Sequence, residues 1–316
     1  MGVKLPIVGG PNLVRAIVIL AGLSIATCAT AQTSVFDQRR QVFSFEIVNQ
    51  TEPIRPATTP TAPPSSGPAT TSSSSPSAPA SSPETKNKVA KEITDKVQEF
   101  LAKREFAKAI AVITEALATD TANAELYRLR ATIQCRAANV KLCLEDVSKA
   151  VETDTDYAPA YLFRGLVRID IGQPQDALPD CEATIRIWPE RPLGYNCRGL
   201  ANSALREFAR ATTDFDEALS RDAKFAAAHY NKGLNFARQN KLDEAIESFS
   251  AAVQINDKYD ESYAQRGNAR VAKGDVAGGR ADFAKALSLN GRNFTAAVGM
   301  QALQVGKALD TLAGKK

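Results

Sequence analysis

The chain has 316 residues, 44% of them hydrophobic, and its 39 basic and 35 acidic side chains give a formal charge of +4. This near balance gives no electrostatic case for a nucleic-acid partner, which would require basic groups clustered on one face. The single histidine and the two methionines leave little material for a His-rich metal site or a Met-lined groove. We therefore expect neither a metal ion nor a cofactor.

Residues 1–31 have the pattern of a secretory signal peptide. Lys4 and Arg15 supply positive charge, Ala16 to Ala26 is an apolar run, and Ala29-Thr30-Ala31 offers small residues at a cleavage site. The run is shorter than the roughly 20 residues that a membrane-spanning helix needs. We expect cleavage near Ala31 and a periplasmic or secreted mature chain.

A second interpretation of the same region concerns Cys28. The stretch Ile25-Ala26-Thr27-Cys28 resembles a bacterial lipoprotein box, in which the cysteine is lipidated, although Thr27 stands where glycine or alanine is usual. In this alternative the chain is an outer-membrane lipoprotein. Membrane attachment is expected only through a lipidated Cys28 or an uncleaved signal.

Two further segments precede the body of the chain. Residues 32–50 form a short arm, in which 42–48 (VFSFEIV) partly alternates like a strand. It is either unstructured or a docking segment for a partner or for the protein's own groove. Residues 51–89 are dominated by Pro, Ser, Thr and Ala and are expected to be a disordered linker.

From residue 90 to residue 293 the sequence repeats every 34 residues without a gap. With Ala90 as position 1, the repeats are repeat 1 (90–123), repeat 2 (124–157), repeat 3 (158–191), repeat 4 (192–225), repeat 5 (226–259) and repeat 6 (260–293). A fixed period of this length indicates a stacked array.

Large and small side chains occupy fixed positions of the repeat. Position 4 is mostly aromatic and position 8 mostly small, which lets two helices approach closely while a ring fills the gap beside them. Position 4 is Ile93, Tyr127, Tyr161, Tyr195, His229 and Tyr263, and position 8 is Val97, Ala131, Gly165, Gly199, Gly233 and Gly267. His229 is therefore interpreted as a packed ring rather than as a ligand or a base.

These positions resemble the tetratricopeptide repeat family, whose pattern also has an aromatic residue at position 24 and proline at position 32. Position 24 is Phe215, Phe249 and Phe283 in repeats 4 to 6, whereas only Pro189 keeps the proline. The resemblance implies an all-α fold, a right-handed α-solenoid of six stacked helix-turn-helix repeats. Residues 294–316 would add a capping helix and a tail.

Within each repeat we expect helix A over positions 2–14 and helix B over positions 17–30, antiparallel across a turn near position 15 or 16. Arginine at position 7 then faces aspartate at position 23, and we predict that each such pair bridges the two helices. The pairs are Arg130 with Asp146, Arg164 with Asp180, Arg198 with Asp214 and Arg266 with Asp282.

Four cysteines remain after signal removal. Cys135 and Cys143 are symmetric about Asn139 in an A–B turn, and Cys181 and Cys197 are symmetric about Pro189 between two repeats. Residues placed symmetrically about an antiparallel turn tend to face one another, and an exported chain meets an oxidising compartment. We predict both local disulfides; the alternative is that all four are small core residues.

In the family that the chain resembles, the concave surface comes mainly from helix-A positions 2, 5, 9, 12 and 13. Carried over to this sequence, the predicted groove residues are Leu162, Leu166, Ile169, Leu193, Asn196, Leu200, Tyr230, Leu234, Arg238 and Asn268. Such a surface suits an extended or helical peptide, although part of it could be packing between adjacent repeats. No nucleophile, base or metal constellation is visible.

The sequence thus predicts a non-catalytic interaction scaffold of the bacterial cell envelope that binds a protein or peptide partner. The alternative is a structural or assembly factor anchored at the outer membrane.

Overall fold

The structure, a computed structural model, describes the backbone of residues 83–313 and the side chains of residues 92–308. The predicted signal peptide, the arm 32–50, the linker up to residue 82 and residues 314–316 lie outside the described residues. Within residues 83–313 the chain forms thirteen helices and no strand.

The helices follow the 34-residue period. Helix A occupies positions 1 to 13 or 14 and helix B positions 17 to 30, so helix A begins one residue earlier than expected. The helices are α3 (Pro83–Ala102), α4 (Phe106–Thr119), α5 (Ala124–Arg136), α6 (Val140–Thr153), α7 (Ala158–Asp170), α8 (Pro174–Ile187), α9 (Pro192–Ala204), α10 (Phe208–Arg221), α11 (Ala226–Arg238), α12 (Leu242–Ile255), α13 (Asp260–Lys273), α14 (Val276–Leu289) and α15 (Phe294–Ala313).

The first helix differs from the sequence prediction. Because α3 begins at Pro83, residues 83–89, which we assigned to the linker, are helical. Proline is favoured in the first turn of a helix because its missing N–H has no intrahelical partner there. The Glu- and Lys-rich sequence that follows favours helix once that start is provided.

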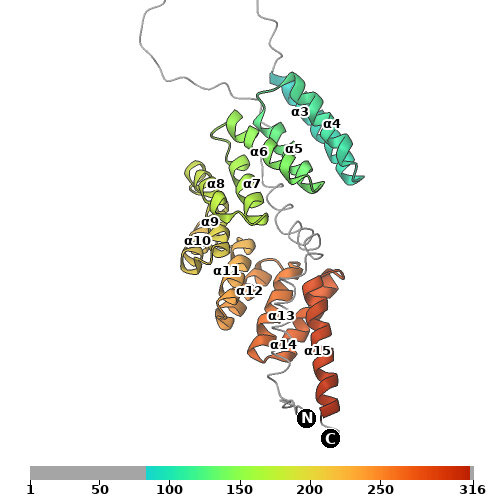
Figure 1. Cartoon of the computed structure of the whole chain (residues 1–316), viewed down its shortest axis with the longest axis vertical. Helices are drawn as coiled ribbons and strands as arrows, with labels where there is room; N and C mark the ends of the chain where they lie inside the picture. Colours follow the sequence, from blue (N-terminus) through green and yellow to red (C-terminus); the bar gives the residue numbers. More distant parts are fainter. Residues whose placement is uncertain (1–82, 314–316) are drawn as a thin grey trace, which may run out of the picture. The chain divides into compact units, whose positions relative to one another are not determined.

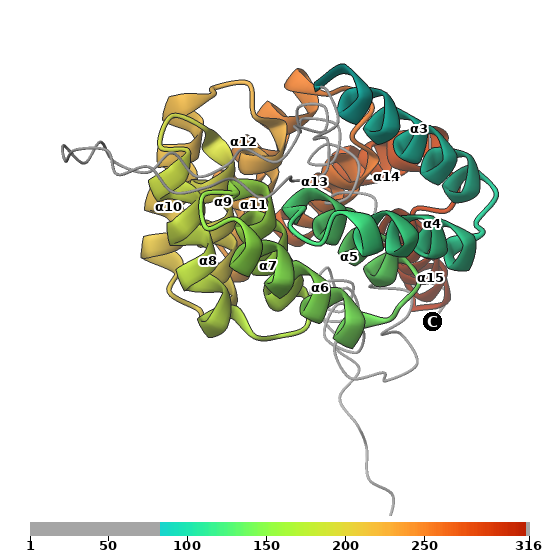
Figure 2. The ribbon, with the colours of Figure 1, turned by 90° about the horizontal axis from the view of Figure 1, so that it is seen from above.

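The described chain divides into two compact units. The N-terminal unit holds the helices up to Val167, and the C-terminal unit runs from Arg168 to the end of α15, so the boundary falls within α7. In the C-terminal unit, α8 to α15 follow one another as helix pairs, and α11 lies against both α9 and α13 (Figures 1 and 2). The A helices of this unit therefore form one row.

The A–B turns share one backbone device. In all six repeats position 15 has positive φ, although only two of these residues are glycine: Arg104, Ala138, Gly172, Arg206, Asn240 and Gly274. The N–H of position 16 then donates to the carbonyl of position 11, as from Glu207 to Asn202 at 2.9 Å. This bond satisfies a carbonyl at the end of helix A and turns the chain into helix B.

Helices A and B pack closely where position 8 meets position 24. A Cβ added to Gly199, Gly233 or Gly267 would lie 2.7 Å from the ring of the phenylalanine at position 24 in the same repeat. Phe215, Phe249 and Phe283 are at most 1% exposed. The missing side chain of one helix therefore makes the space that the ring of the other fills.

The last helix closes the array as predicted. α15 packs against α13 and α14, and the ring of Phe283 lies against Gly299, where a Cβ would come within 2.4 Å. At position 8, where α7, α9, α11 and α13 carry glycine, α15 carries Gln301, which is exposed. A polar residue in that slot suits a terminal helix with water on its outer face.

Among the helices in the described part of the chain, none is long and apolar enough to span a membrane.

Candidate functional site

Three of the four predicted Arg–Asp pairs form in the structure, each through two hydrogen bonds, and two of them are bidentate. Arg130 meets Asp146 at 2.9 and 2.6 Å, and Arg266 meets Asp282 at 2.9 and 2.7 Å. Arg198 places Nε and Nη2 at 2.8 and 2.7 Å from one oxygen of Asp214. The aspartates are at most 8% exposed, so each pair ties helix A to helix B inside the repeat.

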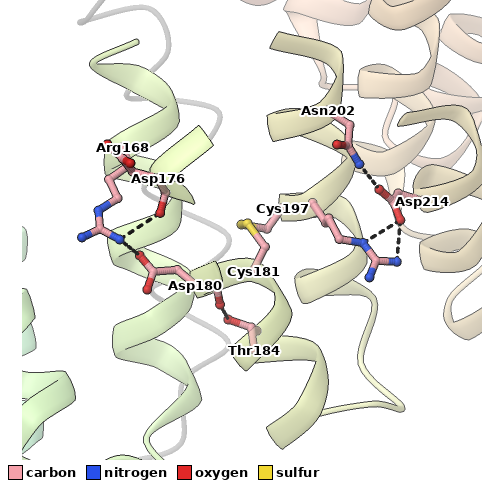
Figure 3. The surroundings of a disulfide bond; sticks show 9 residues. Arg168, Asp176, Asp180, Cys181, Thr184, Cys197, Asn202 and Asp214 are labelled. Atoms are coloured by element: carbon pink, nitrogen blue, oxygen red, sulfur yellow. Dashed lines mark hydrogen bonds and ion pairs between the residues drawn. A yellow bond between two sulfur atoms is a disulfide. The ribbon is translucent and has the colours of Figure 1, made fainter. Parts of the chain in front are cut away.

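In repeat 3 the residues at positions 7 and 23 have other hydrogen-bond partners. Arg164 donates to Ser148 at 3.3 Å, and Asp180 accepts from Arg168 at 2.7 Å (Figure 3). Contact between Arg164 and Asp180 stays a prediction. Arg168 stands at position 11, one helical turn beyond position 7 on the same face.

Position 11 is the partner that the sequence interpretation missed. Asn202 donates to the second oxygen of Asp214 at 2.7 Å, and Arg270 donates to Asp282 at 2.8 Å (Figure 3 for Asn202). The signal was present in the sequence, because positions 7 and 11 are spaced i, i+4 and face helix B together. In repeats 4 and 6 the position-23 carboxylate is thus an acceptor shared by positions 7 and 11 rather than half of a simple pair.

Repeat 5 has Ser248 instead of aspartate at position 23, and its position-7 cation pairs with a carboxylate of the preceding repeat. Lys232, at position 7, meets Asp216 at 2.6 Å, and Asp216 stands at position 25 of repeat 4. Arg130 and Arg266 likewise reach Thr114 and Ser250, at position 25 of the preceding repeat. Position 7 therefore joins neighbouring repeats as well as the two helices of one repeat.

The structure joins the four cysteines in the two predicted pairs. Cys135, in the last turn of α5, is bonded to Cys143 in α6, and Cys181 of α8 is bonded to Cys197 of α9 (Figure 3). The first pair closes an A–B turn and the second closes the junction of repeats 3 and 4. At that junction Gly194 is also needed, because its Cβ would lie 2.9 Å from the backbone nitrogen of Ile185.

The predicted groove set divides by burial. Five members are at most 7% exposed and pack between helices, which corrects their assignment to an open surface: Leu162, Leu166, Leu193, Asn196 and Tyr230. Tyr230, for example, stacks against Phe249 and Tyr259. The other five retain exposed surface: Ile169, Leu200, Leu234, Arg238 and Asn268.

Polar side chains on the A helices of the C-terminal unit bond to each other across repeats. Asn231 of α11 donates to Asn196 of α9 at 2.9 Å, and Arg238 donates to Ser203 at 2.9 Å. Position 5 asparagine is thus used for stacking, a role that spacing within one repeat could not reveal. The accessible feature that remains is position 9 on three successive A helices, Leu200, Leu234 and Asn268, which we call the position-9 row.

The carboxylate of Glu261 is surrounded by neutral hydrogen-bond donors. Glu261 in the first turn of α13 accepts from Gln265 at 2.9 Å, Thr295 at 3.0 Å and Asn293 at 3.1 Å. Burial raises the pKa of Glu261 above its ordinary value of 4.5, and the three hydrogen bonds oppose that rise. The contacts from Asn293 and Thr295 tie α13 to the start of α15.

No group of three or more His, Cys, Asp or Glu side chains that could hold a metal ion occurs among the described residues. His229 contacts the carbonyl oxygen of Ala223 at 3.1 Å in the position-4 slot.

Stacked helix pairs with interlocking glycine and phenylalanine positions define an all-α helical-repeat solenoid. The family model described as tetratricopeptide repeat matches residues 198–260. The crystal structure of PilW, a type IV pilus biogenesis factor, superimposes with a TM-score of 0.59 at 16% identity, covering 68% of this chain and 97% of that chain. A tetratricopeptide repeat protein from Parabacteroides merdae gives 0.57 at 21% identity, covering 71% and 90%. Residues 198–260 are thus similar to the tetratricopeptide repeat family, and the described residues share the helical-repeat fold of these solved structures.

Relatives by sequence match only part of their own length. Tetratricopeptide repeat protein 13 of Homo sapiens is 28% identical over 131 residues, which are 42% of this chain and 15% of that protein. Hsp70-Hsp90 organizing protein 1 of Glycine max is 25% identical over 218 residues, 66% of this chain and 38% of that protein. The chain therefore spans well under half of the relatives it matches.

Proposed function

We propose that the protein is a non-catalytic protein–protein interaction scaffold that holds a peptide or helix of a partner on the A-helix surface of its C-terminal unit. The observation that carries the proposal is the position-9 row. Leu200, Leu234 and Asn268 keep exposed surface on three adjacent helices, whereas the side chains at position 5 of the same helices are buried. Partly exposed apolar side chains at one repeat spacing suit recognition of alternate side chains of a bound segment.

The chemistry of the row indicates the kind of partner. Two leucines offer apolar contact, Asn268 offers an amide, and the exposed Arg238 at position 13 adds positive charge beside Leu234. A segment with apolar side chains and a nearby acidic group matches this combination. The matched relatives named as an Hsp70-Hsp90 organizing protein and as the mitochondrial import receptor subunit TOM70 of Homo sapiens support an interaction role for this repeat type.

We also propose that the scaffold works in the bacterial cell envelope. The signal-peptide pattern of residues 1–31 and the pairing of four cysteines in two disulfides, which are typical of oxidising compartments, support this location. The intact mass of the chain purified from the envelope tests it: cleavage near Ala31 supports a periplasmic chain, and a lipid adduct on Cys28 supports the outer-membrane assembly factor. An uncleaved chain recovered from the cytoplasm contradicts both.

Site-specific photocrosslinking in the native cell tests the surface. A photoreactive residue replaces Leu200 or Leu234 in turn, with exposed Arg210 on α10 as the matched control. Both row positions should crosslink to the same partner and the control should not. Equal yield from the control would exclude the row as the binding surface.

A negative charge introduced into the position-9 row then tests how tightly the partner is bound. Leu234→Glu should lower crosslinking from Leu200 at least tenfold, because a carboxylate must be desolvated against the bound apolar segment. Thr213→Glu, on the exposed side of α10, should leave it unchanged. Circular dichroism of both variants checks that the fold is retained. Tyr230 and Leu166 are unsuitable for this test, because both are buried.

A further inference from the structure

The two disulfides differ in access. Cys143, Cys181 and Cys197 are fully buried, whereas Cys135 is only partly buried. A thiolate opens a disulfide by bonding to one of its sulfurs, so the rate depends on which sulfur can be reached. Of these four cysteines only Cys135 keeps exposed surface in the folded chain, so attack by a thiolate from solvent is favoured at Cys135.

The helix ends favour the same direction of attack. Cys135 lies in the last turn of α5 (Ala124–Arg136), and Cys143 is the fourth residue of α6 (Val140–Thr153). The N-terminus of a helix stabilises a thiolate, and the C-terminus disfavours one. A disulfide breaks faster when the charge on the departing sulfur is stabilised, and of the two sulfurs only that of Cys143 lies near a helix N-terminus.

The Cys181–Cys197 disulfide has neither a partly exposed cysteine nor a cysteine close to a helix end. Cys181 lies in the interior of α8 and Cys197 in the interior of α9, and both are fully buried. It should stay closed under conditions that open the first one.

We propose that Cys135–Cys143 is a thiol-exchange site for small monothiols of the glutathione type. The thiolate bonds to Sγ of Cys135, the Cys135–Cys143 bond breaks, and its electron pair leaves on Sγ of Cys143, which then takes a proton from water. The products are a mixed disulfide on Cys135 and a free thiol on Cys143, with no net change in oxidation state. The adduct stands at position 12 of helix A, at the end of an A–B turn that has lost its covalent link.

Peptide mapping after exposure of the whole chain to glutathione tests the proposal. Samples are quenched with acid, alkylated and digested with trypsin without reduction; cleavage after Arg136 and Lys141 separates the two cysteines. We expect glutathione on Cys135 and alkylation of Cys143, with at least tenfold more adduct on Cys135 than on Cys143. The Cys181–Cys197 peptide should remain disulfide-linked.

The same reaction in urea is the control for folding, because both sulfurs are then accessible and the adduct ratio should fall toward one. A Cys181→Ala/Cys197→Ala variant should keep the folded-state preference for Cys135. The proposal is overturned by four free thiols in the untreated chain, by adduct mainly on Cys143, by equal opening of both disulfides, or by the same adduct ratio with and without urea. It is also overturned if the folded chain forms no adduct while the unfolded chain does.

Discussion

Two aspartates on one helix offer a direct comparison of a buried and an exposed ion pair. Asp214 and Asp216 both lie on α10 and both meet the position-7 cation of an A helix, Arg198 and Lys232 respectively. The side chain of Asp214 is 5% exposed and that of Asp216 is 54% exposed. Asp214 also accepts from Asn202 at 2.7 Å.

Replacement of each aspartate by alanine should therefore have very different costs. Removing one partner of a buried pair costs about 3–5 kcal/mol, but the Arg198 side chain is 31% exposed and can partly rehydrate. We expect Asp214→Ala to lower the free energy of unfolding by about 2–3 kcal/mol, and Asp216→Ala by under about 1 kcal/mol, as for exposed pairs.

Urea unfolding followed by far-ultraviolet circular dichroism measures both costs on the same chain. Because repeat arrays can lose two-state behaviour, amide hydrogen exchange in α9 and α10 should accompany it. Exchange protection should fall around Asn202 in the Asp214 variant only. If the two variants differ by less than about 0.5 kcal/mol, the shared-acceptor role of position 23 is refuted.

Three further predictions concern local packing, backbone strain and pH. Gly233→Ala should destabilise by about 1–2 kcal/mol, because overpacking against Phe249 outweighs the helix-propensity gain; a raised Tm would contradict the interlock. Arg206→Gly should raise the free energy of unfolding by up to about 1 kcal/mol, because glycine adopts the φ of 65° at this position without strain. Asn240→Gly should have a smaller effect, because asparagine tolerates its φ of 59° better than arginine does. Urea unfolding measures both, and equal effects would argue against strain at Arg206. Burial raises the pKa of Glu261, so the folded chain binds that proton more tightly and loses stability as pH rises from 4.5 through the raised pKa. Glu261→Gln should accordingly become more favourable relative to wild type as the pH rises above 4.5, and a difference that stays constant over that rise would contradict this assignment.

Spacing within one 34-residue repeat is enough to predict the helices and most of the contacts that join the two helices of a repeat. Position 7 faces position 23 whenever two helices of this length fold back across a short turn. The Arg–Asp bridges at Arg130, Arg198 and Arg266 follow from that register. The two cysteine pairs follow from symmetry about a turn in the same way.

How neighbouring repeats meet could be learned only from the folded stack, because the sequence of one repeat does not state which side chains its neighbour covers. Asn196 was an expected ligand contact and instead bonds to Asn231 of the next repeat. Lys232, with no aspartate in its own repeat, pairs with Asp216 of the preceding one. On α9, α11 and α13 stacking also left position 9 partly exposed while burying position 5, since the exposure of a residue on helix A depends on the distance to the adjacent helix A. The candidate binding surface therefore depends on how the repeats stack, whereas the helices that build it follow from the sequence of each repeat.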